Sequence, residues 1–410
     1  MNIERIHAKT LIRTSNRSPH HIHLNIYQGC YHNCVYCNGI ADNYHMHDDF
    51  GERIKAKINA PHLFEKYLIK EGYYPIFRDG TKTLDEFLPH QQFHKTEYKK
   101  PEFLLSLFGN VCDIYQPAEE EMQLTRKLLQ IACDYGIPVR LLTKNALVLR
   151  DLDLIKKIHK VSFARVAFTI TLINEEDQRI FEPRASSSLA RLLALKKFRE
   201  EGIPSGAYIT PVIPFIGDTE ENLNGIYEKL KSFNSEFIIT GGLTLKPGRN
   251  KERFMKVIRD NYSHLYSKFE DLYSNNNPFG QPNPIIAQKF NLIQPVKRGY
   301  ELAHKYGLNY FEPRYIPNVK NRINLTIATY LARIGFIKNE ISQEDGTIGH
   351  EFRKAASVLE HLDTNISLMS NSDFEALQLS SSTIPIIKNI IKTGKCNYLD
   401  QNGDFGSLFV

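Results

Sequence analysis

Short apolar segments alternate with amphipathic segments between residues 102 and 245 of this chain. Apolar runs of this length are typical of buried strands, and apolar side chains spaced three and four residues apart are typical of helices. Their alternation indicates βα units and a parallel sheet. With one further strand before the first cysteine, the predicted strands are 22–27, 103–108, 139–143, 166–171, 207–213 and 237–243.

Residues that favour helix ends mark where the helices begin and stop. The glutamates after Pro117 suit the positive end of a helix dipole, and Gly136 ends that helix. Asp151 is expected to cap the next helix. Each of the six strands leads toward a helix, which favours an open (β/α)6 barrel over a closed eight-stranded one. A doubly wound open sheet is the alternative fold.

Three regions lie outside this alternation. We expect an N-terminal arm at residues 1–20 and a polar insertion at about 41–100, which is partly helical at 61–71. The barrel core then spans residues 21–250. Residues 251–410 form a mainly helical C-terminal extension. Its clearest amphipathic helices are predicted near 324–337 and 351–362.

Composition places the chain among globular proteins with a sizeable core, since 42% of its 410 residues are hydrophobic and 24% are charged. Apolar runs stay well short of the roughly 20 residues that a membrane span needs. The first 20 residues carry no export signal, so we expect a cytoplasmic protein with no membrane partner. A net charge of +6 permits contact with nucleic acid but does not by itself indicate it.

The chemistry concentrates in residues 30–37, where Cys30, Cys34 and Cys37 are spaced C-x3-C-x2-C with Tyr36 before the last cysteine. Thiolates are soft ligands suited to iron–sulfur clusters, and four-iron clusters usually take four of them. Three thiolates can therefore hold three irons and leave the fourth open for a small molecule. This spacing predicts a [4Fe-4S] cluster on the three cysteines.

Zinc binding and disulfide formation are the two other structural uses of such cysteines. Structural zinc normally takes four ligands, and no second CxxC-type pair is present, although His32, His45 or His47 could complete a Cys3His site. A disulfide framework is disfavoured because six cysteines in 410 residues are sparse.

Polar residues follow the predicted strands at the ends where barrel enzymes carry their chemistry. Asn110 and Cys112 follow the second strand, Lys144 the third, Thr169 lies late in the fourth and Thr210 late in the fifth. We expect these side chains to share one rim with the cysteines.

The cysteine spacing, with its penultimate aromatic residue, resembles the signature of the radical S-adenosylmethionine (radical SAM) enzymes. The resemblance implies an α/β fold, the partial (β/α)6 radical SAM barrel. It implies that the open iron binds S-adenosylmethionine, and that an electron from the cluster cleaves this cofactor to a 5′-deoxyadenosyl radical. It also implies an external electron donor of the flavodoxin or ferredoxin type.

Six further segments resemble the spore photoproduct lyase-like branch, often described as DNA repair photolyases, and this resemblance covers residues 21 to about 250. It implies a lyase-like activity on damaged DNA, with DNA as a candidate partner. The alternatives are a radical SAM enzyme acting on a peptide or small metabolite, and a non-catalytic iron–sulfur or zinc protein. The segments are 113–119, 142–145, 149–154, 168–171, 181–185 and 210–214.

Carried over by position, the resemblance implies that Lys144 neutralises the carboxylate of S-adenosylmethionine and that the Thr169 hydroxyl contacts it. Thr210 would touch the adenosine through a late-strand backbone group, and Asn110 would make a further polar contact. In spore photoproduct lyase, a hydrogen-donating cysteine stands three residues before an aspartate. In this chain the residue three positions before Asp113 is Asn110, and Cys112 directly precedes Asp113. Cys112 is therefore a candidate hydrogen-atom donor, with a small apolar side chain as its alternative role.

The shared Glu-Pro-Arg segment contains Glu182 and Arg184. We expect it to brace the rim, and a buried Glu–Arg pair there would be hydrogen-bonded and rigid.

Overall fold

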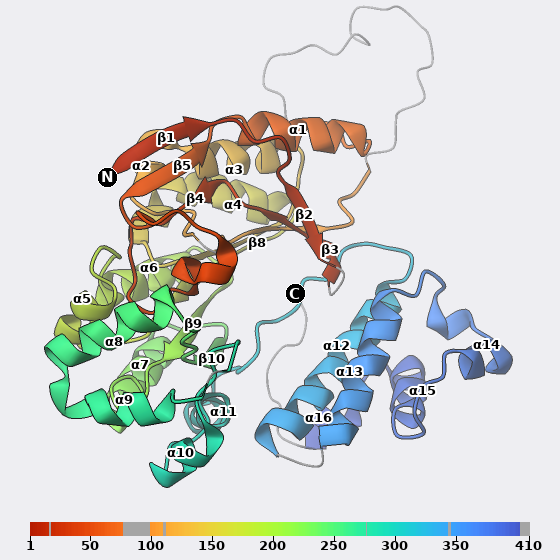
Figure 1. The fold of residues 1–410 in the computed structure, drawn as a ribbon. Coiled ribbons are helices and arrows are strands. Elements are labelled where there is room, and N and C mark those ends of the chain that lie inside the picture. Colours follow the sequence, from red (N-terminus) through yellow and green to blue (C-terminus); the bar gives the residue numbers. More distant parts are fainter. Residues whose placement is uncertain (16–17, 77–98, 110–111, 276, 343–345, 402–410) are drawn as a thin grey trace, which may run out of the picture.

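The computed structural model describes residues 1–15, 18–76, 99–109, 112–275, 277–342 and 346–401 (Figure 1). Its main sheet has seven strands, and six of them are parallel, as predicted. The seventh, β2, was not predicted and pairs antiparallel with β3 at one edge. In spatial order the strands are β2 (Ile12–Ser15), β3 (Ser18–Leu24), β6 (Leu104–Leu107), β7 (Val139–Thr143), β8 (Ala164–Thr169), β9 (Ser205–Val212) and β10 (Ile238–Gly242).

The parallel strands follow one another in chain order across the sheet. A doubly wound sheet reverses direction at a switch point, and none occurs here. Right-handed crossovers without a reversal place the helices on one face, so the fold is a partial (β/α)6 barrel rather than the doubly wound alternative. The helices between the strands are α2 (Ala118–Met122), α3 (Leu124–Asp134), α4 (Leu152–Val161), α5 (Glu175–Phe181), α6 (Ser188–Glu200) and α7 (Glu220–Ser232).

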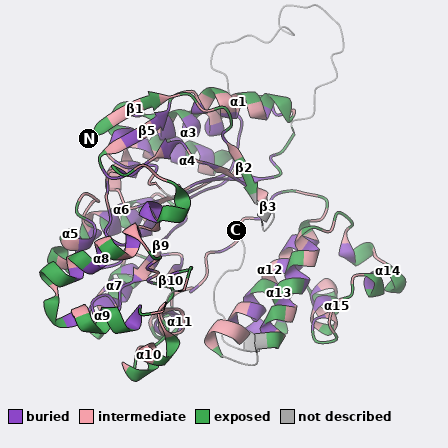
Figure 2. Cartoon of the chain, viewed as in Figure 1, coloured by how far each residue is buried: buried purple, intermediate pink, exposed green. Residues whose placement is uncertain are grey.

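Alternate strand residues point to opposite faces of this sheet. Leu105, Leu141, Val166 and Ile209 belong to the apolar core shared with the helices. Figure 2 shows that buried residues concentrate in the strands and on the helix sides that cover them. The intervening residues of each strand therefore face the barrel interior.

Two predicted helix features are wrong. The segment 117–135 forms two helices because Gln123 adopts a left-handed conformation with φ of 49°. The Glu119 carboxylate accepts the Thr125 amide at 3.0 Å and so caps the second helix. Asp151 makes no capping bond to α4, because its carboxylate pairs with the guanidinium groups of Arg126 and Arg150 at 2.8 Å.

The arm and the insertion contribute a second sheet that was not predicted. It contains β1 (Asn2–Ile6), β5 (Arg53–Lys57) and β4 (Tyr27–Gln28), in that order. The end of the predicted strand 22–27 thus belongs to β4 rather than to β3. Helix α1 (Ala60–Lys70) confirms the predicted helix at 61–71.

The C-terminal part is helical, as expected, and the helices from α12 onward share a separate apolar core. None of the helices in the described residues is long and apolar enough to cross a membrane. The helices are α8 (Arg249–Asn261), α9 (Tyr266–Leu272), α10 (Pro284–Lys289), α11 (Pro295–Tyr306), α12 (Arg322–Phe336), α13 (Gly346–Glu360), α14 (Asn371–Ala376), α15 (Ile384–Thr393) and α16 (Asn397–Gln401).

Candidate functional site

The segment 29–38, here called the cysteine loop, follows β4 and is held by residues distant in the chain. Its backbone amides donate to the carbonyls of Phe50 and Phe181 at 3.1 and 2.8 Å. The Gln116 side chain both accepts from the loop, at 2.8 Å, and donates to it, at 3.1 Å. Arg253 and Asn250 donate to loop carbonyls at 2.7 and 3.0 Å. The loop is therefore fixed from several sides before any ligand binds.

The thiols of this loop are free and sheltered from water. Cys30 and Cys34 are each only 7% exposed, and Cys37 is partly buried. Burial raises the pKa of all three thiols, that of Cys34 to about 12. Binding to a cationic metal centre offsets this penalty, because a coordinating thiol is deprotonated. Three closely grouped, unoxidised thiols fit the predicted cluster.

A single zinc ion and a four-iron cluster place different demands on the positions of their ligand atoms. Among the residues that the structure describes, no three His, Cys, Asp or Glu side chains converge on one point that could hold a metal ion. Zinc needs such convergence, since its ligand atoms all lie about 2.0–2.3 Å from one centre. In a four-iron cluster each thiolate binds a different iron, so the sulfur atoms need not converge.

The histidines considered as zinc ligands have other neighbours. His32 is fully buried, with Nδ1 3.5 Å from Asp113 Oδ2 and Nε2 3.4 Å from the Asn145 amide. His47 pairs with Asp49 at 2.9 Å, and His45 is exposed.

Asp113 joins the loop after β6 to the loop after β7. Its carboxylate accepts the Thr143 hydroxyl and the Lys144 amide, each at 2.7 Å, and faces His32 of the cysteine loop. The Lys144 ammonium consequently lies 5.7 Å from the centre of the Tyr36 ring. The structure therefore brings Lys144 to the cysteine loop.

Thr169 and Thr210 occupy inward positions near the ends of the neighbouring strands β8 and β9. Thr169 is buried, and its carbonyl accepts the Arg191 guanidinium at 2.6 Å. Thr210 is half-buried and faces Gly241, where a β-carbon would lie 3.0 Å from its hydroxyl oxygen. Asn110, the fourth candidate contact to the cofactor, lies outside the described residues.

Glu182 does brace the rim, but through a different arginine from the one expected. Its carboxylate pairs with fully buried Arg191 of α6 and accepts the hydroxyls of Tyr36 and Thr171. Burial alone would raise the pKa of Glu182, but the charges of Arg191 and Lys144 lower it to about 2.

The expected Glu182–Arg184 pair is therefore wrong. Arg184 packs over the Tyr31 ring at 4.3 Å and donates to the Gly51 carbonyl at 2.8 Å. One sequence signal could have identified Arg191. It is the single charged residue on the apolar face of α6, beside Leu192, Leu195 and Phe198.

Cys112 packs against the apolar cluster that contains Cys30, beside the cysteine loop. Its sulfur lies 3.4 Å from Asn25 Oδ1. Burial and the neighbouring Asp113 carboxylate raise the pKa of the thiol to about 12, so it stays protonated at neutral pH. The buried Lys57, which donates to the Asn25 carbonyl at 2.6 Å, was not anticipated from the sequence.

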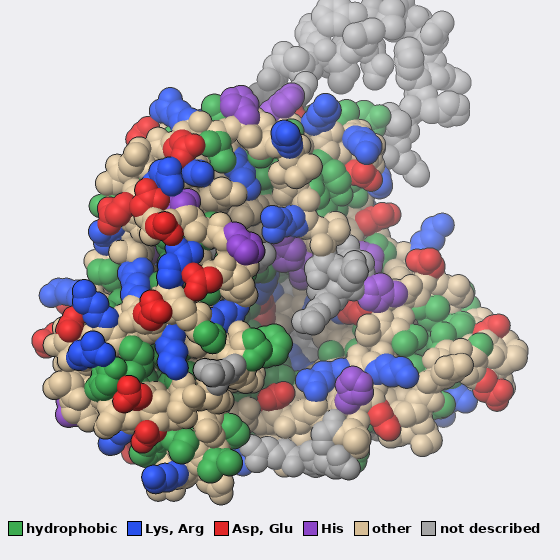
Figure 3. Space-filling model, viewed as in Figure 1, with side chains coloured by type: hydrophobic (Ala, Val, Ile, Leu, Met, Phe, Trp, Pro, Cys, Tyr) green, Lys and Arg blue, Asp and Glu red, His purple; other side chains and the backbone are tan. Residues whose placement is uncertain are grey.

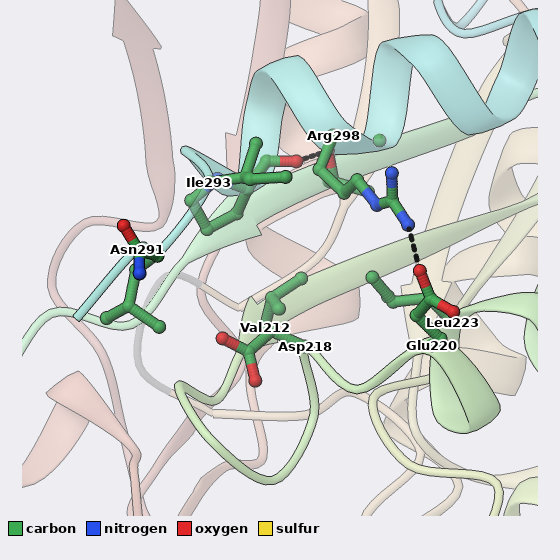
Figure 4. Close-up of a pocket in the computed structure, with 11 residues that line it drawn as sticks. Val212, Asp218, Glu220, Leu223, Asn291, Ile293 and Arg298 are labelled. Atoms are coloured by element: carbon green, nitrogen blue, oxygen red, sulfur yellow. Dashed lines mark hydrogen bonds and ion pairs between the residues drawn. The ribbon is translucent and has the colours of Figure 1, made fainter. Parts of the chain in front are cut away.

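Two pockets open near these elements. One of about 480 Å³ borders the cysteine loop at Asn33 and is also lined by Arg253, which donates to the Asn33 carbonyl. The other, of about 170 Å³, lies between β9, β10 and α11 and contains none of the predicted site residues (Figure 4). There Arg298 reaches Glu220 at 3.4 Å, and burial raises the pKa of Asp218 to about 6.

No protein-family profile matches this chain. An uncharacterized protein of Methanocaldococcus jannaschii is 28% identical over 244 residues, which are 59% of this chain and 77% of that protein. An uncharacterized protein of Acidianus two-tailed virus is 27% identical over 56% of this chain and 69% of its own length. An uncharacterized protein of Mycobacterium tuberculosis is 24% identical over 62% of this chain and 68% of its own length.

Among solved structures, a variant of spore photoproduct lyase aligns with a TM-score of 0.42 and 17% identity, over 64% of this chain and 66% of that one. Spore photoproduct lyase in complex with dinucleoside spore photoproduct aligns with a TM-score of 0.45 and 15% identity, over 74% of this chain and 78% of that one.

Proposed function

We propose that this chain is a radical SAM enzyme, with Cys30, Cys34 and Cys37 as the ligands of a [4Fe-4S] cluster. The observation that carries the proposal is the cysteine loop itself, in which three free, sheltered thiols lie on a rigidly held backbone. When bound, the reduced cluster and S-adenosylmethionine supply a 5′-deoxyadenosyl radical.

The neighbouring side chains have distinct tasks in this proposal. The Lys144 ammonium would neutralise the carboxylate of S-adenosylmethionine, because it already lies beside Tyr36 of the loop. The Thr169 hydroxyl would contact S-adenosylmethionine, a backbone group at Thr210 would touch its adenosine, and Asn110 is a further candidate contact. Glu182 would keep the loop in place through Tyr36.

For the substrate we propose a spore photoproduct lyase-like reaction on a damaged pyrimidine in DNA. Cys112 would give the hydrogen atom of its S–H bond to a carbon radical of the substrate, which gains a C–H bond while the sulfur becomes a thiyl radical. An electron from a flavodoxin- or ferredoxin-type donor, with a proton, would restore the thiol. A reducing cytoplasmic compartment suits this chemistry. A peptide or small metabolite is the alternative substrate.

Anaerobic purification tests the enzyme class. The protein should be brown with about four irons per chain, and alanine at Cys30, Cys34 or Cys37 should abolish iron binding. With dithionite, it should convert S-adenosylmethionine to methionine and 5′-deoxyadenosine. Cys133→Ala is the matched control, since this buried cysteine packs in the apolar core at α3. A colourless protein that carries one zinc would contradict the proposal.

A further inference from the structure

The inner face of the barrel carries a row of polar side chains at one level of the sheet. His23 of β3 is in register with Ser106 of β6, which is in register with Arg140 of β7. Their strand neighbours Ile22 and Leu105 belong to the helix-covered core, so the row points the other way, into the interior. Neighbouring strands lie about 4.8 Å apart, which places His23 and Ser106 side by side.

Two atoms of this row lack partners. Ser106 is completely buried, yet its hydroxyl has no hydrogen-bond partner among the described residues, and the same holds for buried Nδ1 of His23. By contrast, the buried Ser205 hydroxyl of β9 donates to the Val166 carbonyl at 2.6 Å. Unpaired buried polar groups destabilise a fold, so an adjacent pair of them indicates a ligand contact.

The surroundings of this pair limit what it could bind. The Arg140 charge is already neutralised by Glu312, and burial lowers the pKa of His23, which keeps the imidazole neutral. The Phe108 ring meets the His23 ring edge-on at 5.1 Å and lies 5.0 Å from the Arg140 guanidinium. The pair therefore offers uncharged hydrogen-bonding groups beside an aromatic ring.

His23 and Ser106 are close in sequence to the residues of the proposed active site. Strand β3 leads into β4 and the cysteine loop, and β6 leads toward Cys112. Figure 3 shows a hollow near the centre of this face of the molecule, with histidine and basic side chains around it.

We propose that His23 and Ser106 form a substrate subsite for the uncharged edge of a planar cyclic amide or imide. A hydroxyl and a neutral imidazole can each donate or accept, so an N–H beside a C=O satisfies both. The Phe108 ring supplies an apolar wall for a planar ring. A phosphate is disfavoured, because both cations at this level, Arg140 and the Arg165 in register with it, are already paired with carboxylates. The subsite rests on the proposed function, since it positions the substrate of that enzyme.

Thymidine tests the subsite as a simple cyclic imide, measured by saturation-transfer NMR on the anaerobic, cluster-loaded protein. 3-Methylthymidine lacks the imide N–H and should bind about tenfold more weakly. Ser106→Ala should weaken thymidine binding about threefold to tenfold, the loss expected for one hydrogen bond. The same variant should melt no lower than the wild type, because it removes an unpaired group.

Ser205→Ala is the matched control, and it should lower the melting temperature while leaving thymidine affinity unchanged. Inorganic phosphate should not displace thymidine. Unchanged affinity in Ser106→Ala, equal binding of 3-methylthymidine, or tighter binding of the linear amide N-acetylglycinamide would each overturn the subsite. Iron content and 5′-deoxyadenosine formation are measured on the same samples. If the wild-type protein contains no iron and forms no 5′-deoxyadenosine, the proposed function is contradicted. The affinity for thymidine tests the subsite whether or not the protein forms 5′-deoxyadenosine.

Discussion

The carboxylate of Glu182 accepts a hydrogen bond from the hydroxyl of Tyr36, which lies 146 residues earlier in the chain. The second carboxylate oxygen pairs with the guanidinium of Arg191, and both side chains of this ion pair are fully buried. One buried acid therefore ties the cysteine loop to the wall of the barrel. The position of Cys37 next to Tyr36 thus depends on an interaction far from it in sequence.

Glu182→Gln should destabilise the protein strongly. It leaves the Arg191 charge buried without a counter-ion, which costs about 3–5 kcal/mol. Tyr36→Phe removes one hydrogen bond and should cost about 1 kcal/mol. Thermal unfolding under anaerobic conditions should rank the two variants in that order. Arg179→Gln is the control, because this exposed arginine pairs with exposed Glu175 of the same helix. Equal melting temperatures for Glu182→Gln and the control would contradict the bracing role.

Lys144→Ala should weaken S-adenosylmethionine binding by about tenfold or more, since it removes the charge proposed to pair with the carboxylate. Iron content should not change, because lysine is not a ligand of the cluster. Lys156→Ala is a suitable control, as this half-exposed lysine pairs with Glu201 on the outer helices. Equilibrium binding of S-adenosylmethionine to both variants decides the matter, and an unchanged affinity in Lys144→Ala would remove Lys144 from the site.

Cys112→Ala should leave four irons and the cleavage of S-adenosylmethionine intact while preventing formation of the correct repair product. The reason is that the variant removes only the proposed hydrogen donor. Cys112 packs against the group of apolar side chains that contains Cys30. The iron content of the Cys112→Ala variant is therefore the informative control. A loss of iron in this variant would indicate a fourth thiolate ligand instead of a hydrogen donor.

DNA binding by this protein should depend on salt. If the substrate is a damaged pyrimidine in DNA, affinity should fall steeply as salt rises, because phosphate contacts release counterions. Fluorescence anisotropy with a lesion-containing oligonucleotide at 50 and 200 mM salt measures this slope. Absence of binding at low salt would favour a peptide or metabolite as the substrate.

The sequence was most informative where structure depends on local pattern. Parallel strands such as β6 and β8 are apolar runs, and the helices between the strands carry capping residues such as Ser187 and Thr219. The small sheet of β1, β4 and β5 was missed because its strands are short and its pairings join distant segments. The wrong partner for Glu182 has a different cause: Arg184, in the turn after α5, is nearer in the sequence, whereas Arg191 reaches Glu182 from the buried side of α6.

The unpaired atoms of His23 and Ser106 could not be recognised from sequence either. A histidine or serine in a strand is ordinary, and only the register of β3 and β6 places the two side by side. The cysteine motif was readable because its three cysteines fall within eight residues of sequence.

Asp218 should make stability depend on pH. Burial raises its folded pKa from 3.8 to about 6, so the folded state holds the proton more tightly than the unfolded state does. Folding stability is therefore highest at low pH with respect to this group, falls as pH rises through the window from about 4 to 6, and stays reduced above it. Asp218→Asn removes the charged form and should stabilise the protein at pH 7 by about 1–3 kcal/mol.

Melting temperatures of wild type and Asp218→Asn between pH 4 and 8 test this dependence. The two curves should meet near pH 4, separate up to pH 6 and then run parallel. Glu220→Gln is the control at the same pocket, because its exposed side chain pairs only loosely with Arg298. A constant difference between wild type and Asp218→Asn across the whole range would show that the effect does not come from titration of Asp218.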